Sequence, residues 1–174
     1  MNTGLIVLHC WEDMQNPIEL EAMSKIKTVL ADTRLPVLGS VITRQDIRDL
    51  IPNCVHEDIM IASNRHIIEQ WVKKHKINNI VLAGFHYNLC IRQLESRLFE
   101  LCESMGKDWN NDFKVQVLQD CTAAVIDDEV FNIINIIKDY ENFHFGQVST
   151  DFSEPEKVVN MYTYIVGEDI VNDY

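Results

Sequence analysis

The chain has 174 residues, 47% of them hydrophobic, and its 27 acidic and 15 basic side chains give a formal net charge of -12. This length suits one domain with a core of its own, and the negative charge repels nucleic-acid phosphates and anionic membranes, so neither is expected as a partner. The five cysteines form no CxxC pair and no zinc-like spacing, and we read no signal peptide. A reducing, cytoplasmic location is therefore expected.

The first half of the chain alternates short apolar runs with amphipathic segments. A first strand is expected over 5–9, because four aliphatic residues follow one another without alternation, as in a central parallel strand. A helix over 18–32 and a second strand over 37–43 follow. A third strand is expected over 58–62. The next helix has one apolar face, made of Ile67, Ile68, Trp71, Val72 and His75.

The second half is organised around a strand, a turn and a helix. Residues 79–84 form an apolar run closed by Gly84, whose backbone permits a sharp turn. A helix then begins near Asn88, so Cys90 falls in its first turn, where the helix dipole should lower the pKa of the thiol. The remaining expected elements are a strand over 114–118, a helix from Asp127 or Asp128 to about Tyr140, and a sixth strand over 143–149.

This alternation predicts an α/β fold with a doubly wound, mainly parallel six-stranded sheet and helices on both faces. Ligands of such sheets bind outside the carboxyl ends of the strands. By this rule one set of residues is expected at the carboxyl edge of the sheet, namely His9, Arg44, the segment 62–66, Cys90 and Asp120. For Asp120 we favour a role in forming the turn.

We assign residues 1–154 to this domain and residues 155–174 to a C-terminal extension. The extension is too apolar for a solvated tail. We expect it to pack on its own domain or on a neighbouring subunit, and we favour a homo-oligomer.

Three stretches, in the same order, carry a resemblance to a known family. Gly84-Phe85-His86-Tyr87-Asn88-Leu89-Cys90-Ile91 resembles the strand, turn and helix start of the isochorismatase-like cysteine hydrolases, whose nucleophilic cysteine follows the glycine by six residues. Tyr87 stands at the family's usual threonine position. Residues 5–8 (LIVL) are similar to the family's first strand, and 115–124 (VQVLQDCTAA) to its fifth strand and the Asp-x-x-Ala turn after it.

The resemblance implies a hydrolase that attacks a small amide or related C–N bond through Cys90, with an aspartate at the end of the first strand as base. Counting from LIVL, the aspartate position is His9. Aligning the family's Asp-Met-Gln-Asn instead gives Asp13. We favour His9, because burying four aliphatic residues outweighs a short polar match, and a histidine can take a thiol proton near neutral pH.

The family's lysine after the third strand is absent here, since no lysine occurs between Lys27 and Lys73. Arg65 or His66 would have to replace it. The candidates for substrate binding at the same edge are His86, Tyr87, Arg44 and Arg65.

Other functions compete with cysteine-dependent hydrolysis. One is a catalytically inactive family member that serves as a ligand-binding or protein-interaction scaffold, which the missing lysine favours. A weaker alternative is vinyl-ether hydrolysis of the isochorismate type, which in the family does not depend on the cysteine. The sequence Asp46-Ile47-Arg48 lacks the histidines of the nicotinamidase branch, and no glycine-rich phosphate loop is present. We therefore expect no metal and no cofactor, and a small molecule as substrate or ligand.

Overall fold

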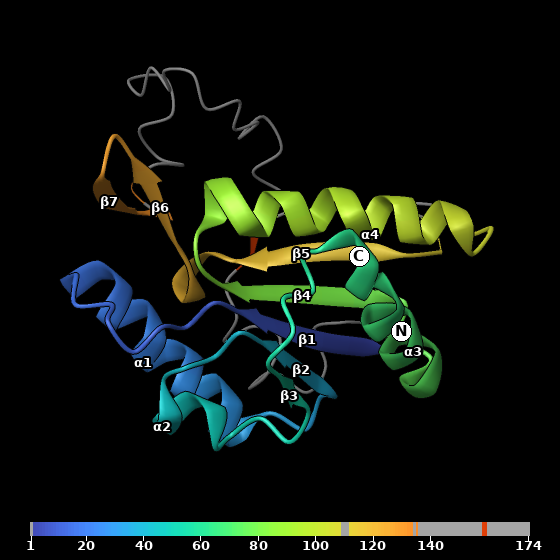
Figure 1. Cartoon of the computed structure of the whole chain (residues 1–174), viewed down its shortest axis with the longest axis horizontal. Coiled ribbons are helices and arrows are strands. Elements are labelled where there is room, and N and C mark those ends of the chain that lie inside the picture. Colours follow the sequence, from blue (N-terminus) through green and yellow to red (C-terminus); the bar gives the residue numbers. More distant parts are fainter. Residues whose placement is uncertain (1, 109–111, 134, 136–157, 160–174) are drawn as a thin grey trace.

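The computed structural model describes residues 2–108, 112–133, 135 and 158–159. Six strands of this part of the chain form one parallel sheet in the order β3-β2-β1-β4-β5-β8 (Figure 1). The strands are β1 (Thr3–Leu8), β2 (Val37–Ser40), β3 (Cys54–Val55), β4 (Asn79–Gly84), β5 (Lys114–Leu118) and β8 (Val158–Val159). The predicted fold class, a doubly wound parallel α/β sheet, is confirmed.

Helices cover both faces of this sheet (Figure 1). They are α1 (Pro17–Asp32), α2 (Gln45–Arg48), α3 (Arg65–His75) and α4 (Arg92–Ser104). Leu5 and Val7 of β1 pack in the cluster that contains α1 and α2, whereas Ile6 and Leu8 pack in the cluster of α3 and α4. Because successive side chains of a strand point to opposite faces, a strand covered on both sides must be apolar throughout.

The predicted helix over 18–32 and the predicted helix with the apolar face Ile67 to His75 are confirmed as α1 and α3. Asn16 caps α1, since its Oδ1 accepts a hydrogen bond of 2.9 Å from the Ile18 amide, and Pro17 occupies the first turn. In α3 the buried residues are Ile68, Trp71 and Val72, all from the predicted apolar face.

The direction of the chain across the sheet reverses between β1 and β4. The chain passes from β1 through β2 to β3 at one edge, and then returns to β4 on the other side of β1. Leu8 pairs with Gly84, so the two strands end side by side. Gly84 has φ +108°, and an added Cβ would lie 2.0 Å from the Leu8 carbonyl oxygen, so only glycine fits there. His9 and Phe85 therefore leave adjacent strand ends at the switch point of the sheet, where ligands of such folds bind.

The predicted third strand over 58–62 is wrong. Residues 58–61 form a turn that leads into a short 3₁₀ helix, η1 (Ala62–Asn64). Side chains satisfy the backbone here, since Ser40 Oγ accepts from the Ile59 amide at 3.1 Å and Asp58 Oδ1 accepts from the Met60 amide at 2.9 Å. Ile59 and Met60 are both buried, which explains why this segment is apolar without being a strand.

The predicted helix after Asp127 or Asp128 is also wrong at its start. An antiparallel hairpin occupies this part of the chain, with strands β6 (Ala123–Ile126) and β7 (Glu129–Asn132). Asp127 and Asp128 have φ of 48° and 66°, as in the two-residue turns that match the twist of a hairpin, and aspartate tolerates this left-handed region better than most residues.

Two predictions concern parts of the chain that are largely not described. The predicted strand over 143–149 lies outside the described residues. Of the extension over 155–174, Val158 and Val159 are described, and they pair in parallel with Val117 and Leu118 of β5.

Candidate functional site

Cys90 lies in a helical turn that follows β4 at the carboxyl edge of the sheet. The peptide bond Phe85–His86 is cis, and residues Tyr87–Ile91 then form one turn of π-helix, η2, that runs directly into α4. The Ile91 amide donates to the His86 carbonyl at 3.2 Å, the five-residue spacing of a π-helix. Single π turns at the ends of α-helices occur often at functional sites.

Two side chains hold this turn in place. Asn88 is buried and makes two hydrogen bonds to Val125 of β6, donating from Nδ2 to the carbonyl at 2.6 Å and accepting from the amide at 3.1 Å. Tyr87 is buried in the core cluster of α4, and the Arg92 guanidinium lies 5.9 Å above its ring. Tyr87 therefore supports the turn from the core side.

The expectation that the helix start lowers the pKa of Cys90 is wrong. Burial of the sulfur raises the pKa of the thiol, and the negative charge of Asp58 raises it further. Hydrogen bonds from the backbone of His86 and of Cys90 itself act in the opposite direction but are smaller. Cys90 thus rests as a neutral thiol.

His9 is the first residue after β1, and it is buried with 3% of its surface exposed. Its backbone has a φ of +53°, and its amide donates to the Ser40 carbonyl at 3.0 Å. The imidazole stacks on Trp11, with ring centroids 5.1 Å apart and 16° between the planes. Its Nε2 lies 3.3 Å from Asp58 Oδ1, whereas Nδ1 is buried and has no hydrogen-bond partner among the described residues.

Asp58 lies 3.3 Å from the imidazole of His9, and its negative charge raises the pKa of the Cys90 thiol. The structure therefore brings His9, Asp58 and Cys90 to one edge of the sheet. Asp58 was not among the candidates predicted from the sequence. The sequence does contain a signal for Asp58. When a histidine replaces the family's aspartate, a carboxylate is a suitable partner for it, whereas the family's lysine is not.

The other predicted residues lie around this group or away from it. Asp13 is exposed in the turn that precedes α1. Arg44 follows β2, where its amide donates to the Cys10 carbonyl at 3.1 Å and its Nε lies 3.3 Å from Asp46 Oδ1. His86 Nε2 lies 2.5 Å from Oε1 of Glu19, in the first turn of α1.

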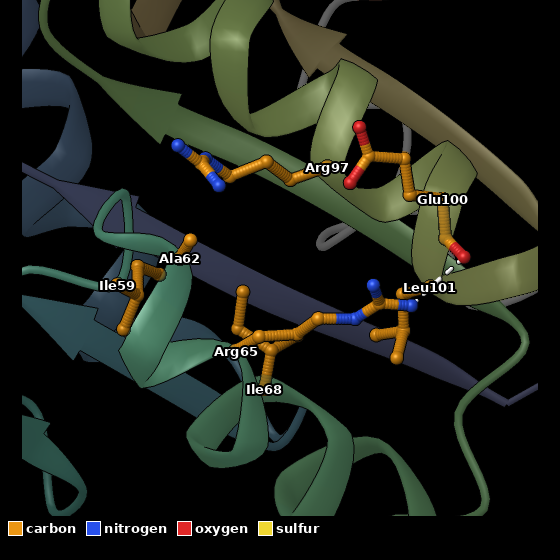
Figure 2. Close-up of a pocket in the computed structure, with 7 residues that line it drawn as sticks. All are labelled: Ile59, Ala62, Arg65, Ile68, Arg97, Glu100 and Leu101. Carbon is orange, nitrogen blue, oxygen red and sulfur yellow. Dashed lines mark hydrogen bonds between the residues drawn. The ribbon is translucent and has the colours of Figure 1, made fainter. Parts of the chain in front are cut away.

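Arg65 lines a separate cavity of about 110 Å³ between η1, α3 and α4 (Figure 2). Its Nη2 donates to the Glu100 carbonyl at 2.8 Å and to Ser104 Oγ at 2.7 Å. Figure 2 shows the Arg97 guanidinium pointing the other way, toward Ala62. The residues around the cavity are Ile59, Ala62, Arg65, Ile68, Arg97, Glu100 and Leu101. Arg65 thus connects α3 to the middle and end of α4, whereas Cys90 precedes that helix.

The described part of the chain offers neither a cluster of metal ligands nor a membrane-spanning helix. It contains no group of three or more His, Cys, Asp or Glu side chains that could hold a metal ion. None of its helices combines the length and the apolar character needed to cross a membrane.

No protein-family model and no curated protein sequence matches the chain, but solved structures do. The isochorismatase-like hydrolase from Alkaliphilus metalliredigens is similar with a TM-score of 0.52 at 16% identity, over 96% of this chain and 99% of that one. The isochorismatase from Pseudomonas putida KT2440 gives a TM-score of 0.54 at 12% identity, over 81% of this chain and 82% of that one. The YcaC gene product of Escherichia coli is described as an octameric hydrolase of unknown specificity. It gives a TM-score of 0.55 at 13% identity, over 99% of this chain and 82% of that one. The chain therefore has the fold of the isochorismatase-like hydrolases.

Proposed function

We propose that this chain is a hydrolase of the isochorismatase-like family that cleaves a small amide or related C–N bond through Cys90, with His9 as general base. The observation that carries the proposal is the pairing of Leu8 with Gly84, which puts His9 and the Cys90 turn at neighbouring strand ends. The shared fold and the sequence of residues 84–91 support the same assignment. His9 is preferred over Asp13 as base because it is buried at this edge and Asp13 is exposed.

The proposed reaction begins with the protonated thiol of Cys90. Cys90 Sγ attacks the carbonyl carbon while its proton passes to His9, so that a C–S bond forms and the π electron pair moves to oxygen. The oxyanion then collapses, the C–N bond breaks, and the leaving nitrogen takes the proton from His9. Water adds to the thioester and gives a proton to His9. The C–S bond breaks, the acid leaves and the sulfur regains its proton.

The backbone of the Cys90 turn suits the charge that this reaction develops. Hydrogen bonds from the backbone of His86 and Cys90 favour negative charge on the sulfur. Donors fixed in this way also stabilise an oxyanion next to the attacked carbon, because they need no reorganisation during the reaction.

A second candidate function, a ligand-binding or interaction scaffold without turnover, is favoured by the raised pKa of Cys90 and by the missing lysine. The test is ammonia release from a panel of small amides and carbamoyl compounds by the parent, Cys90→Ala and His9→Ala. Cys54→Ala is the matched control, since Cys54 is also partly buried. We expect His9→Ala to lower kcat by about 10²- to 10⁴-fold and Cys90→Ala to abolish release. Release that survives Cys90→Ala would contradict Cys90 as the nucleophile. The absence of release with every compound would leave the scaffold.

We further propose that the protein acts as a cytoplasmic homo-oligomer on a small molecule. The octameric description of the Escherichia coli YcaC gene product supports the assembly. The mass of the intact chain, measured by light scattering, tests it, and a monomer at micromolar concentration would contradict it.

A further inference from the structure

We propose that Asp58 is a positioning residue that holds His9 in the tautomer protonated on Nε2, so that Nδ1 carries the lone pair with which His9 acts as a base. This inference rests on the proposed function for its chemistry, but its structural part can be tested without turnover.

The tautomer follows from the partners of the two ring nitrogens. An ionised carboxylate can only accept hydrogen bonds, so the nitrogen that faces Asp58 at 3.3 Å, Nε2, must carry the hydrogen. A neutral imidazole has one N–H, which leaves a lone pair on Nδ1. That atom is buried and has no partner among the described residues. A buried acceptor without a donor is unfavourable, so the lone pair on Nδ1 is the one available to a proton donor.

The stacking and the backbone of His9 hold the ring in the orientation that directs Nε2 at Asp58. Trp11 stacks against one of its faces. The backbone of His9 is held in the left-handed region by the hydrogen bond from its amide to the Ser40 carbonyl. The side chain is therefore fixed from both its ring and its backbone, and Nε2 stays directed at Asp58.

Hydrogen bonds also fix the position of Asp58. Ser40 is completely buried, and its hydroxyl donates to the Glu57 carbonyl at 2.9 Å and accepts from the Ile59 amide at 3.1 Å. One side chain thus fixes the residues on both sides of Asp58. The Asp58 carboxylate also accepts from the Met60 amide, so that its Oδ1 is set by the backbone before any ligand binds.

In this arrangement Asp58, His9 and Cys90 each have a different role. Asp58 stabilises the imidazolium that forms when His9 takes the proton, and the same negative charge disfavours a thiolate at Cys90 in the resting site. Transfer of the thiol proton from Cys90 to His9 is therefore expected to accompany attack of the sulfur on the carbonyl carbon and not to precede it. A carboxylate that fixes a histidine tautomer in this way has a large effect on turnover and a small one on ground-state binding.

Asp58→Asn tests the proposal, because asparagine keeps an oxygen for the Met60 amide while losing the charge. Asp58→Ala is the second variant, since it removes every acceptor. Asp32→Asn is the matched control, because it removes one charge from an exposed residue at the end of α1. The readout is the ¹⁵N NMR spectrum of the histidine side chains, in which His9 is assigned by its loss in His9→Gln.

We expect the parent and Asp32→Asn to show His9 protonated on Nε2, and Asp58→Ala, which removes the acceptor, to shift toward Nδ1 protonation. With a cleaved amide, kcat of Asp58→Asn should fall by about 10²- to 10⁴-fold, with KM changed only a few-fold. An Nδ1-protonated parent, or a tautomer unchanged in Asp58→Ala, overturns the proposal whether or not turnover is found. A tautomer that follows Asp58 without ammonia release supports the positioning role and contradicts the hydrolase.

Discussion

Among the single residues, Cys90 has the clearest dependence on pH. Its raised pKa means that the neutral thiol predominates to a higher pH than in a free cysteine, whose value is about 8.5. Only the thiolate reacts with iodoacetamide. The alkylation rate of Cys90 should therefore keep rising above pH 8.5, and Asp58→Asn should move the midpoint of this rise to lower pH, because it removes a charge that disfavours the thiolate. Mass spectrometry of the labelled peptides measures both rates.

The other cysteines provide internal references for this experiment. Cys10, Cys102 and Cys121 are buried, and burial raises the pKa of Cys121 to about 12, so these three should react after Cys54 and Cys90. Asp32→Asn should leave the midpoint of Cys90 where it is in the parent. A midpoint that does not respond to Asp58→Asn would show that Asp58 and Cys90 do not share a site.

The sequence identifies part of this site and misses another part for a physical reason. His9 and Cys90 can be predicted because each follows a buried run whose position in a parallel sheet is determined by hydrophobicity alone. Asp58 was missed because the apolar residues after it resemble a strand. In the structure the Ile59 amide bonds to the distant Ser40 side chain and the Met60 amide to the nearby Asp58 side chain. Hydrogen bonds from a backbone to side chains leave no periodic pattern in the sequence.

At the scale of elements, the hairpin β6–β7 is pinned to the Cys90 turn by Asn88. Asn88→Ala would leave both the amide and the carbonyl of the half-buried Val125 without the Asn88 side chain, which is itself buried. We expect a loss of about 1–3 kcal/mol in the free energy of unfolding, together with lower activity, because the turn that carries Cys90 loses its support. Urea denaturation measures the first effect and ammonia release the second.

Gln93→Ala is the matched control for this substitution, since Gln93 is exposed on the next turn of the same helix. It should change stability by less than about 0.5 kcal/mol. Equal stability of Asn88→Ala and Gln93→Ala would refute the pinning role of Asn88.

Elements with a long periodic pattern were predicted well, and short ones were not. α1 and α3 have apolar faces that repeat over several turns, and β4 is a continuous apolar run, so packing and local preference agree. The hairpin has strands of four residues each, too short for an alternating pattern to stand out. Its turn residues Asp127 and Asp128 are also good helix caps, which is why a helix was predicted there.

At the scale of the whole molecule, the parallel sheet depends on a segment far along the chain. β8 is the described edge strand on the β5 side of the sheet, where it pairs with Val117 and Leu118 of β5. Truncation after Glu154 removes β8 and leaves the backbone groups of β5 without that partner. Because an unpaired strand edge is a template for association with other chains, the truncated protein should lose solubility or change its mass, as measured by sedimentation and light scattering.

A second truncation separates the role of β8 from that of the residues after it. A chain ending at Met161 keeps β8 and removes the rest of the extension. If pairing with β5 is what matters, this chain should retain the solubility and mass of the parent while truncation after Glu154 does not. If both truncations alter the mass in the same way, the residues after β8 form the contact between subunits, which is the alternative proposed for this extension. A chain truncated after Glu154 that matches the parent in both properties would contradict either role, because neither the sheet nor an assembly would then depend on residues 155–174.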